Sequence, residues 1–205
     1  MCTAKRCVVA LLLFSGFVQC IQAESPKILR VEEDWRLVLG DPEPLLDSPQ
    51  FSTWMSPTGS LDNEHFCVDF NHAQRPDFSS GGFQTKALVG DSITEDSLSE
   101  NGDNLSQYGE TVTWTQMMAI HSGRLYFAVK DGSSTSWGTF GGGSTVVKFQ
   151  QTPVSDLGGY SPTQSAEWAG VGFGGNRVES LQLLRVRYYL DNGSIVQQEL
   201  NLSVD

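Results

Sequence analysis

The sequence predicts an all-β fold, a single antiparallel β-sandwich of jelly-roll type, with a closed barrel as the competing architecture. Three observations predict it. Apolar and polar residues alternate with period two in several segments, and 21 Gly and 8 Pro separate them into short strands and turns. After residue 24 no window keeps apolar residues at helical spacing. No linker separates two cores, so we expect one domain over residues 24–205.

The clearest strand pattern covers residues 29–37. Leu29, Val31, Trp35 and Leu37 share one parity, and charged residues occupy the other, as expected for a strand with one buried face. Glu33 falls on the apolar parity, and the pattern does not explain it. Residues 66–70 and 83–89 predict two further strands in the same way.

Two hairpins follow from turn residues between alternating segments. Ser122-Gly123 separates residues 112–120 from residues 125–129. Asn192-Gly193 separates residues 184–190 from residues 195–204. A two-residue connection would place Leu190 opposite Ile195 but Val186 opposite Glu199, so a bulge or another loop length is needed there.

Three segments read as loops. Residues 90–110 are polar and acidic and predict an exposed loop. Residues 131–144 are rich in glycine and precede a short apolar run at residues 146–149. Residues 153–176 form a long connection, in which Thr163 to Trp168 has room for one or two helical turns.

The first 23 residues predict a secretory signal peptide. Lys5 and Arg6 precede an apolar run from Cys7 to Phe17, and Ile21-Gln22-Ala23 forms a cleavage site. The run is too short for a transmembrane helix. A lipid anchor at Cys20 is the alternative, although Gln19 stands where a small residue is expected. We therefore expect a secreted or extracytoplasmic protein, in the periplasm or on the cell surface, with no transmembrane segment in the mature chain.

The net charge restricts the molecules that the protein can bind, and the cysteine content restricts its disulfides. The net charge of −11 becomes −13 when Lys5 and Arg6 leave with the leader, which excludes binding to nucleic acid and to anionic membranes. The mature chain keeps Cys67 alone, so it has no internal disulfide. A buried, inert thiol is the favoured interpretation of Cys67, and a reactive thiol or an intermolecular bridge is the alternative.

Two patterns suggest hydrolase chemistry. Gly90-Asp91-Ser92-Ile93-Thr94 resembles the first block of the GDSL esterases, which would make Ser92 a nucleophile. The later blocks of that family are missing, and the only histidine after Ser92 is His121. Glu32 and Asp34 share a strand face and could form a glycosidase pair, but Arg30 and Arg36 flank them, which favours solvated charge.

Metal binding is predicted only for calcium. His65, His72 and His121 show no transition-metal spacing. Asp131-Gly132-Ser133 and the segment from Asp91 to Asp103 supply oxygen ligands, so Ca²⁺ is a candidate cofactor.

Loop aromatics give the best binding prediction. Flat rings on exposed loops suit stacking on sugars, and packing of the rings into the ends of the sandwich is the alternative. The predicted glycan-binding residues lie in the two long loops and are Trp137, Phe140, Tyr160 and Trp168.

Several segments resemble uncharacterised exported β-sandwich proteins of planctomycete-type bacteria: Val31-Glu-Glu-Asp-Trp35, Met55-Ser-Pro-Thr-Gly59, Thr111-Val-Thr-Trp-Thr-Gln116, Ser136-Trp-Gly-Thr-Phe140 and Gly172-Phe-Gly-Gly-Asn-Arg-Val178. The hairpin with its glycine-rich loop is also similar to concanavalin A-like domains, many of which hold sugars, and this likeness implies a concanavalin-like sandwich.

Three functions remain open. The first is an exported non-catalytic binding module for a glycan, such as a polysaccharide or a cell-envelope component. The second is a structural or adhesive protein of the cell envelope. The third is a secreted hydrolase, either an esterase at Ser92 or a glycosidase.

Overall fold

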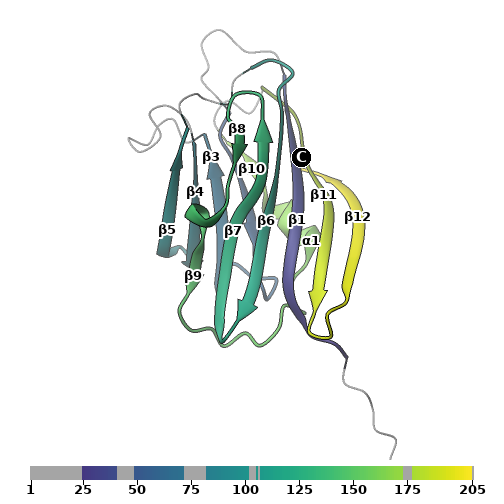
Figure 1. Ribbon diagram of the computed structural model, residues 1–205. Helices are drawn as coiled ribbons and strands as arrows, with labels where there is room; N and C mark the ends of the chain where they lie inside the picture. Colours follow the sequence, from purple (N-terminus) through teal and green to yellow (C-terminus); the bar gives the residue numbers. More distant parts are fainter. Residues whose placement is uncertain are drawn as a thin grey trace, which may run out of the picture.

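The computed structural model describes residues 25–40, 49–71, 82–101, 105, 107–172 and 177–204. The predicted signal peptide, residues 1–23, lies outside this part of the chain. Two antiparallel sheets pack face to face, which confirms the predicted all-β sandwich (Figure 1). No helix of the described residues is long and apolar enough to cross a membrane.

The larger sheet, called sheet A, has seven strands in the order β12-β11-β1-β6-β7-β8, and β9 also pairs with β7. All its pairings are antiparallel. Its strands are β1 (Ile28–Leu39), β6 (Thr111–His121), β7 (Arg124–Ser134), β8 (Gly138–Phe140), β9 (Val147–Phe149), β11 (Val178–Leu190) and β12 (Ile195–Ser203).

The smaller sheet, called sheet B, has five strands in the order β10-β2-β3-β4-β5. Four of them follow one another along the chain, so short turns connect most of this sheet. Its strands are β2 (Phe51–Met55), β3 (Glu64–Phe70), β4 (Gly82–Val89), β5 (Ser92–Glu100) and β10 (Gly170–Val171).

Strand β1 lies near the middle of sheet A, between β6 and β11 (Figure 1). Its alternation is as the sequence predicts: Val31, Trp35 and Leu37 are buried between the sheets. Trp35 lies opposite Trp114 of β6, and the two indole rings stack with centroids 6.1 Å apart. The alternation in β1 therefore places Trp35, a large core side chain, between the two sheets.

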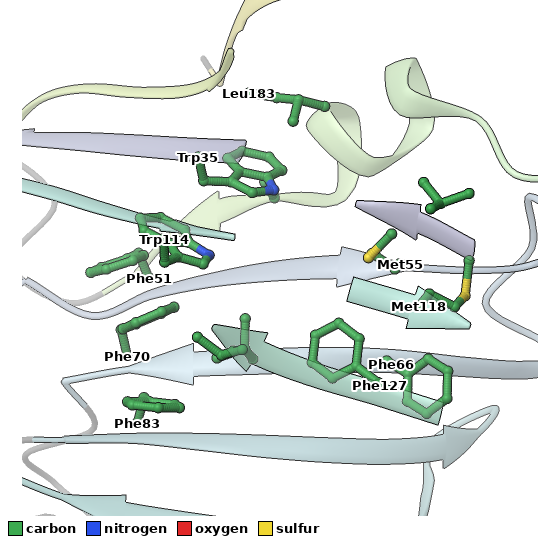
Figure 2. Packing of buried hydrophobic residues seen from close by; sticks show 14 of the residues in the cluster. Trp35, Phe51, Met55, Phe66, Phe70, Phe83, Trp114, Met118, Phe127 and Leu183 are labelled. Carbon is green, nitrogen blue, oxygen red and sulfur yellow. The ribbon is translucent and has the colours of Figure 1, made fainter. Parts of the chain in front are cut away.

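Aromatic rings from both sheets join in the core (Figure 2). Trp114 of sheet A contacts Phe51 and Phe70 of sheet B, with ring centroids 5.7 and 4.8 Å apart. Phe51 and Phe70 also stack on each other at 4.5 Å. These offset and tilted contacts bury large apolar surfaces in favourable ring geometry, so Trp114 connects the two layers.

The two sides of the sandwich are closed differently. On one side helix α1 (Pro162–Trp168) packs against β2 of sheet B and against β11 and β12 of sheet A. Ser161 caps it, and its Oγ accepts a hydrogen bond from Gln164 N. On the other side β9 packs against β4 and β5, and Lys148 N donates to Glu95 Oε2 at 2.7 Å. The edge of β5 is thereby covered, whereas β12 is the last strand of sheet A.

Both predicted hairpins are confirmed. Ser122 and Gly123 have φ values of 51° and 71°, as a tight turn between β6 and β7 requires. In the second hairpin Leu190 N donates to Ser194 O, so three residues form the loop rather than two. That loop places Tyr189 opposite Ile195 and Val186 opposite Gln198, which resolves the register conflict in the sequence.

The prediction of an exposed loop over residues 90–110 was wrong in part. Residues 92–100 form strand β5, which pairs with β4 from Val89↔Ser92 to Gly82↔Glu100. The strand has no large apolar face because backbone pairing holds it and its side chains bond to the neighbouring loop, for example Ser97 Oγ to Ser144 O at 2.5 Å. Strand β2 was missed, although Phe51, Thr53 and Met55 alternate. Residues 102–104 lie outside the described part.

Candidate functional site

The structure brings Trp137 and Phe140 together. They follow the end of β7 and meet edge to face, with centroids 5.3 Å apart. Trp137 also lies 6.3 Å from both Phe70 and Phe83, so its ring joins the aromatic core. Phe140 packs directly over Gly132, where a Cβ would stand 2.4 Å from the ring. Both rings are partly buried, and their contacts are with the protein interior.

Tyr160 and Trp168 lie in the other long connection. Tyr160 is 8% exposed, and its hydroxyl donates to Glu33 Oε1 at 2.6 Å. Trp168 ends helix α1 and is half-buried. No ring contact among the described residues joins either of them to Trp137 or Phe140. The four predicted glycan-binding residues therefore form no common surface in the described part of the chain.

A pocket of about 670 Å³ opens at the end of the sandwich that holds the β6–β7 turn. Three segments build it: the loop between β2 and β3, the adjoining ends of β3 and β4, and the connection after β9. Its volume is in the range of small-molecule sites in proteins. It is lined by Pro57, Thr58, Asn63, Glu64, Val89, Pro153, Val154, Ser155, Asp156 and Gly159. We call it the end pocket.

Hydrogen bonds fix the loops around the end pocket. Ser56 Oγ accepts from Thr58 N and Ser60 N and donates to Ser60 O at 2.7 Å, which holds the first loop in one shape. A Cβ on Gly159 would lie 2.8 Å from Pro57 O, so the connection after β9 packs closely against that loop. The pocket is thus formed by packed backbone.

The two carboxylates that line the end pocket act as hydrogen-bond acceptors. Glu64 accepts a hydrogen bond from the hydroxyl of Thr152, and Asp156 Oδ1 accepts from Gly158 N at 2.8 Å. None of the residues that line the pocket is a lysine or an arginine. Val89 and Val154 provide apolar surface. The pocket therefore suits a ligand with hydrogen-bond donors and apolar C–H faces, and it disfavours an anion.

Glu33 is the residue that the sequence pattern left unexplained. It is fully buried between the sheets, and Trp35 Nε1, the Gln116 amide and the Tyr160 hydroxyl donate to its two oxygens. Burial raises the pKa of Glu33, and these hydrogen bonds oppose the rise only in part. No lysine or arginine pairs with it among the described contacts. Because Glu33 lines none of the described pockets, a substrate bound in one of them could not reach its carboxyl group.

Replacing Glu33 by glutamine is expected to change how stability depends on pH. Because the folded pKa lies above the unfolded value, folding favours the protonated acid, and stability falls as pH rises from the ordinary value near 4.5 through the folded pKa. Glu33→Gln stays neutral, and its oxygen can still accept from Trp35 and Gln116. The difference in unfolding free energy should therefore shift in the variant's favour by up to ~1.4 kcal/mol per pH unit in that window.

Urea denaturation at pH 4, 5, 6, 7 and 8 measures this difference. Glu100→Gln, at the exposed end of strand β5, is the control for a change in net charge. A difference between Glu33→Gln and the parent protein that stays constant over this range would contradict the raised pKa.

Glu32 and Asp34 lie on the outer face of sheet A in an ion-pair network. Arg187 donates to Glu32 Oε2 at 3.1 Å and to Asp34 Oδ1 at 2.8 Å. Arg185 binds Asp34 Oδ2 through two nitrogens, and Lys130 Nζ lies 2.9 Å from Glu32 Oε1. Burial raises the pKa of Glu32, but the bonds from Lys130 and Tyr189 and the nearby positive charges outweigh it and lower the pKa. The charges lie across neighbouring strands, as predicted, and among the described contacts their partners are on β7 and β11 and at Arg30, not at Arg36. Glu32 is only 2% exposed, so the prediction of solvated charge is wrong for this residue.

A second buried polar cluster lies on β2, β3 and β4. Asp69 forms an ion pair with Lys86, and both side chains are less than 10% exposed. Ser52 Oγ and Cys67 Sγ donate to Asp69 Oδ1 at 2.5 and 3.3 Å. Cys67 is fully buried, as the favoured interpretation of this residue predicts. The thiol therefore serves in a hydrogen-bonded network.

The GDSL-like motif is a hairpin turn in the structure. Gly90, with φ of 53°, and Asp91 connect β4 to β5, and Ser92 begins β5. No hydrogen bond between Ser92 and a histidine ring occurs among the described contacts. In the described ranges no group of three or more His, Cys, Asp or Glu side chains could hold a metal ion, so the calcium hypothesis gains no support.

Comparison of the chain with protein-family models, with curated proteins and with solved structures found no match in any of the three. The functional argument therefore depends on the geometry of the chain itself.

Proposed function

We propose that the protein is a non-catalytic binding module that holds a neutral glycan in the end pocket. The observation that carries the proposal is the pocket itself, a preformed hollow of about 670 Å³ with apolar walls and two carboxylates. Sugar hydroxyls donate to Glu64 and Asp156, while C–H faces of a sugar ring contact Val89 and Val154. The loop aromatics in the sequence predicted the same ligand class, but at Trp137, Phe140, Tyr160 and Trp168.

The negative charge of the end pocket restricts the kind of glycan that it can bind. Glu64 and Asp156 line it without a positive partner among the lining residues, so a uronate or sulfated sugar would meet like charge. A neutral oligosaccharide avoids this repulsion. The expected ligand is therefore a neutral polysaccharide or a neutral component of the cell envelope.

Calorimetric titration with neutral oligosaccharides, and with oligogalacturonate as an acidic comparison, tests the proposal. Val89→Trp should fill the pocket and weaken binding at least about tenfold, since a lost apolar contact and a steric block each cost that much. Val89 is 43% exposed, so the fold should tolerate the indole. Val146→Trp is the matched control, because Val146 is 39% exposed and does not line the pocket.

Three results would contradict the proposal: no neutral oligosaccharide binds, the acidic oligosaccharide binds better, or Val89→Trp binds as well as Val146→Trp. Trp168→Ala, measured in the same titration, distinguishes the site predicted from the loop aromatics. If Trp168→Ala abolishes binding and Val89→Trp does not, the aromatic site is the correct one.

The structural or adhesive role remains the second proposal, and one observation favours it: no described strand pairs with the outer edge of β12, the last strand of sheet A. The hydrolase proposal has no comparable support, because Glu33 is enclosed and Glu32 and Asp34 are ion-paired.

A further inference from the structure

The outer edge of β12 is the longest unpaired edge among the described strands. Seven of its nine residues pair with β11 on one side, and no described strand lies on the other. The other strand ends are protected: β8 and β10 have three and two residues, and β9 covers β5. Ile195 and Val196 of β12 are 58% and 51% exposed. The edge therefore offers a regular backbone ladder over residues 195–199, together with apolar side chains.

Two of the features that normally block such an edge, proline and basic residues, are missing from β12. Natural sheets protect edge strands with proline, with lysine or with a strongly twisting bulge. The strand has neither proline nor a basic residue, and Glu199 is its only charged residue. A bulge lies near the end of the strand, where the register with β11 shifts between Glu199 and Leu202 and Asn201 has a φ of 56°. Residues 195–199 thus remain regular and free to pair.

The hairpin fixes which backbone groups face outward. Leu190 N donates to Ser194 O, so Ser194 bonds inward to β11. Hydrogen-bonding direction alternates along an antiparallel strand, and residues 195, 197 and 199 therefore present their N–H and C=O groups to the open side.

We propose that a second copy of this chain pairs with this edge, antiparallel and about a two-fold axis at Gln198, so that sheet A continues from one copy into the other. In this register Gln197 faces Glu199 of the second copy, within the regular part of the strand. Gln197 Nε2 already donates to Glu199 Oε1 at 2.7 Å within one chain, so the same donor and acceptor suit each other across the axis. The inference is independent of the glycan proposal.

Neighbouring registers are less favourable. An axis at Glu199 would set the two Glu199 carboxylates directly opposite each other. An axis at Gln197 would set Ile195 against Glu199. An axis between residues would pair an outward-facing residue with an inward-facing one, which the hydrogen-bonding alternation excludes.

The structure also leaves room for the turn of the second copy. With the axis at Gln198, the turn of the second copy lies beside the end of β12, near Leu202. A hollow of about 320 Å³ borders Leu202 there, between β12 and helix α1, and Ala166 and Val204 also line it. The turn at residues 191–194 of the second copy can therefore approach without displacing the helix.

The expected dimer is weak and favoured by salt. A junction of two strand edges buries less than the ~1,200 Å² of a standard interface, so we expect a dissociation constant on the order of 100 µM. Each copy carries a net charge of −11, and the copies repel each other at low ionic strength. Added NaCl should therefore shift the equilibrium toward the dimer.

Sedimentation equilibrium of the purified protein, with two variants of opposite charge at one position, tests the proposal. Gln197→Glu sets like charges opposite Glu199 twice by symmetry and should weaken the dimer about tenfold, whereas Gln197→Lys should strengthen it about tenfold. Thr111→Glu and Thr111→Lys are the controls, since Thr111 is exposed on β6 and does not lie on this edge. Thermal unfolding of each variant checks that the fold is kept.

A protein that stays monomeric at 1 mM in 0.5 M NaCl would overturn the proposal. A dimer whose strength does not depend on the sign of the charge at residue 197, or changes equally with the charge at residue 111, would also overturn it. Failure here leaves glycan binding unaffected, because the end pocket and β12 share no residue.

Discussion

Trp114→Ala is expected to lower the free energy of unfolding by about 3–5 kcal/mol. The indole is 1% exposed and contacts Trp35, Phe51 and Phe70, so its removal leaves a cavity that involves both sheets. Because β1, β2 and β3 surround that cavity from two layers, the site has little freedom to collapse. Urea denaturation followed by far-UV circular dichroism measures the loss.

Tyr108→Ala is the control for the Trp114 variant. Tyr108 is 64% exposed, and its removal should change stability by less than about 0.5 kcal/mol. A loss of less than about 1.5 kcal/mol for Trp114→Ala would show that the junction of the sheets repacks around the missing ring.

Asp69→Ala is expected to cost about 3–5 kcal/mol, for a different physical reason. The substitution leaves the Lys86 ammonium without its ion-pair partner at a site where its side chain is 9% exposed. Ser52 Oγ and Cys67 Sγ also lose their acceptor. The expected loss is therefore mainly the cost of an uncompensated buried charge. Chemical denaturation at pH 7 is the measurement.

The double variant Asp69→Leu/Lys86→Met separates this cost from a loss of packing. Replacing both partners by apolar groups removes the unpaired charge and should recover most of the stability. If the double variant is as unstable as Asp69→Ala, the ion pair is not the reason for the loss.

The sequence was sufficient to predict those strands that have one face in the apolar core and the other face in a polar environment. Val31, Trp35 and Leu37 of β1 alternate because one face of that strand is core, and the period-two pattern records it directly. Strand β5 was predicted as a loop because neither of its faces is a large apolar surface. Its position depends on backbone bonds to β4 and on bonds such as Lys148 N to Glu95.

The candidate sites were harder to predict because their members are distant in the chain. Glu33 and Tyr160 are 127 positions apart, and no local pattern indicates that their side chains meet. The end pocket joins Thr58, Val89 and Asp156 from three segments, and none of these residues belongs to a recognisable motif. Exposed loop aromatics were a reasonable prediction for a binding surface, but ring contacts such as Trp137 with Phe70 depend on how the loop folds back.

The position of β1 also affects when the protein can fold during its synthesis. This strand is made first among the described elements, yet its neighbours in sheet A are residues 111–121 and 178–190. At ~5–20 residues per second, the ribosome needs on the order of 10 s between β1 and β11. Until then β1 has one open side in the middle of the future sheet. A chain that stops before residue 178 therefore lacks a neighbour of the central strand, and premature termination there should yield an aggregation-prone product rather than a shortened but folded one.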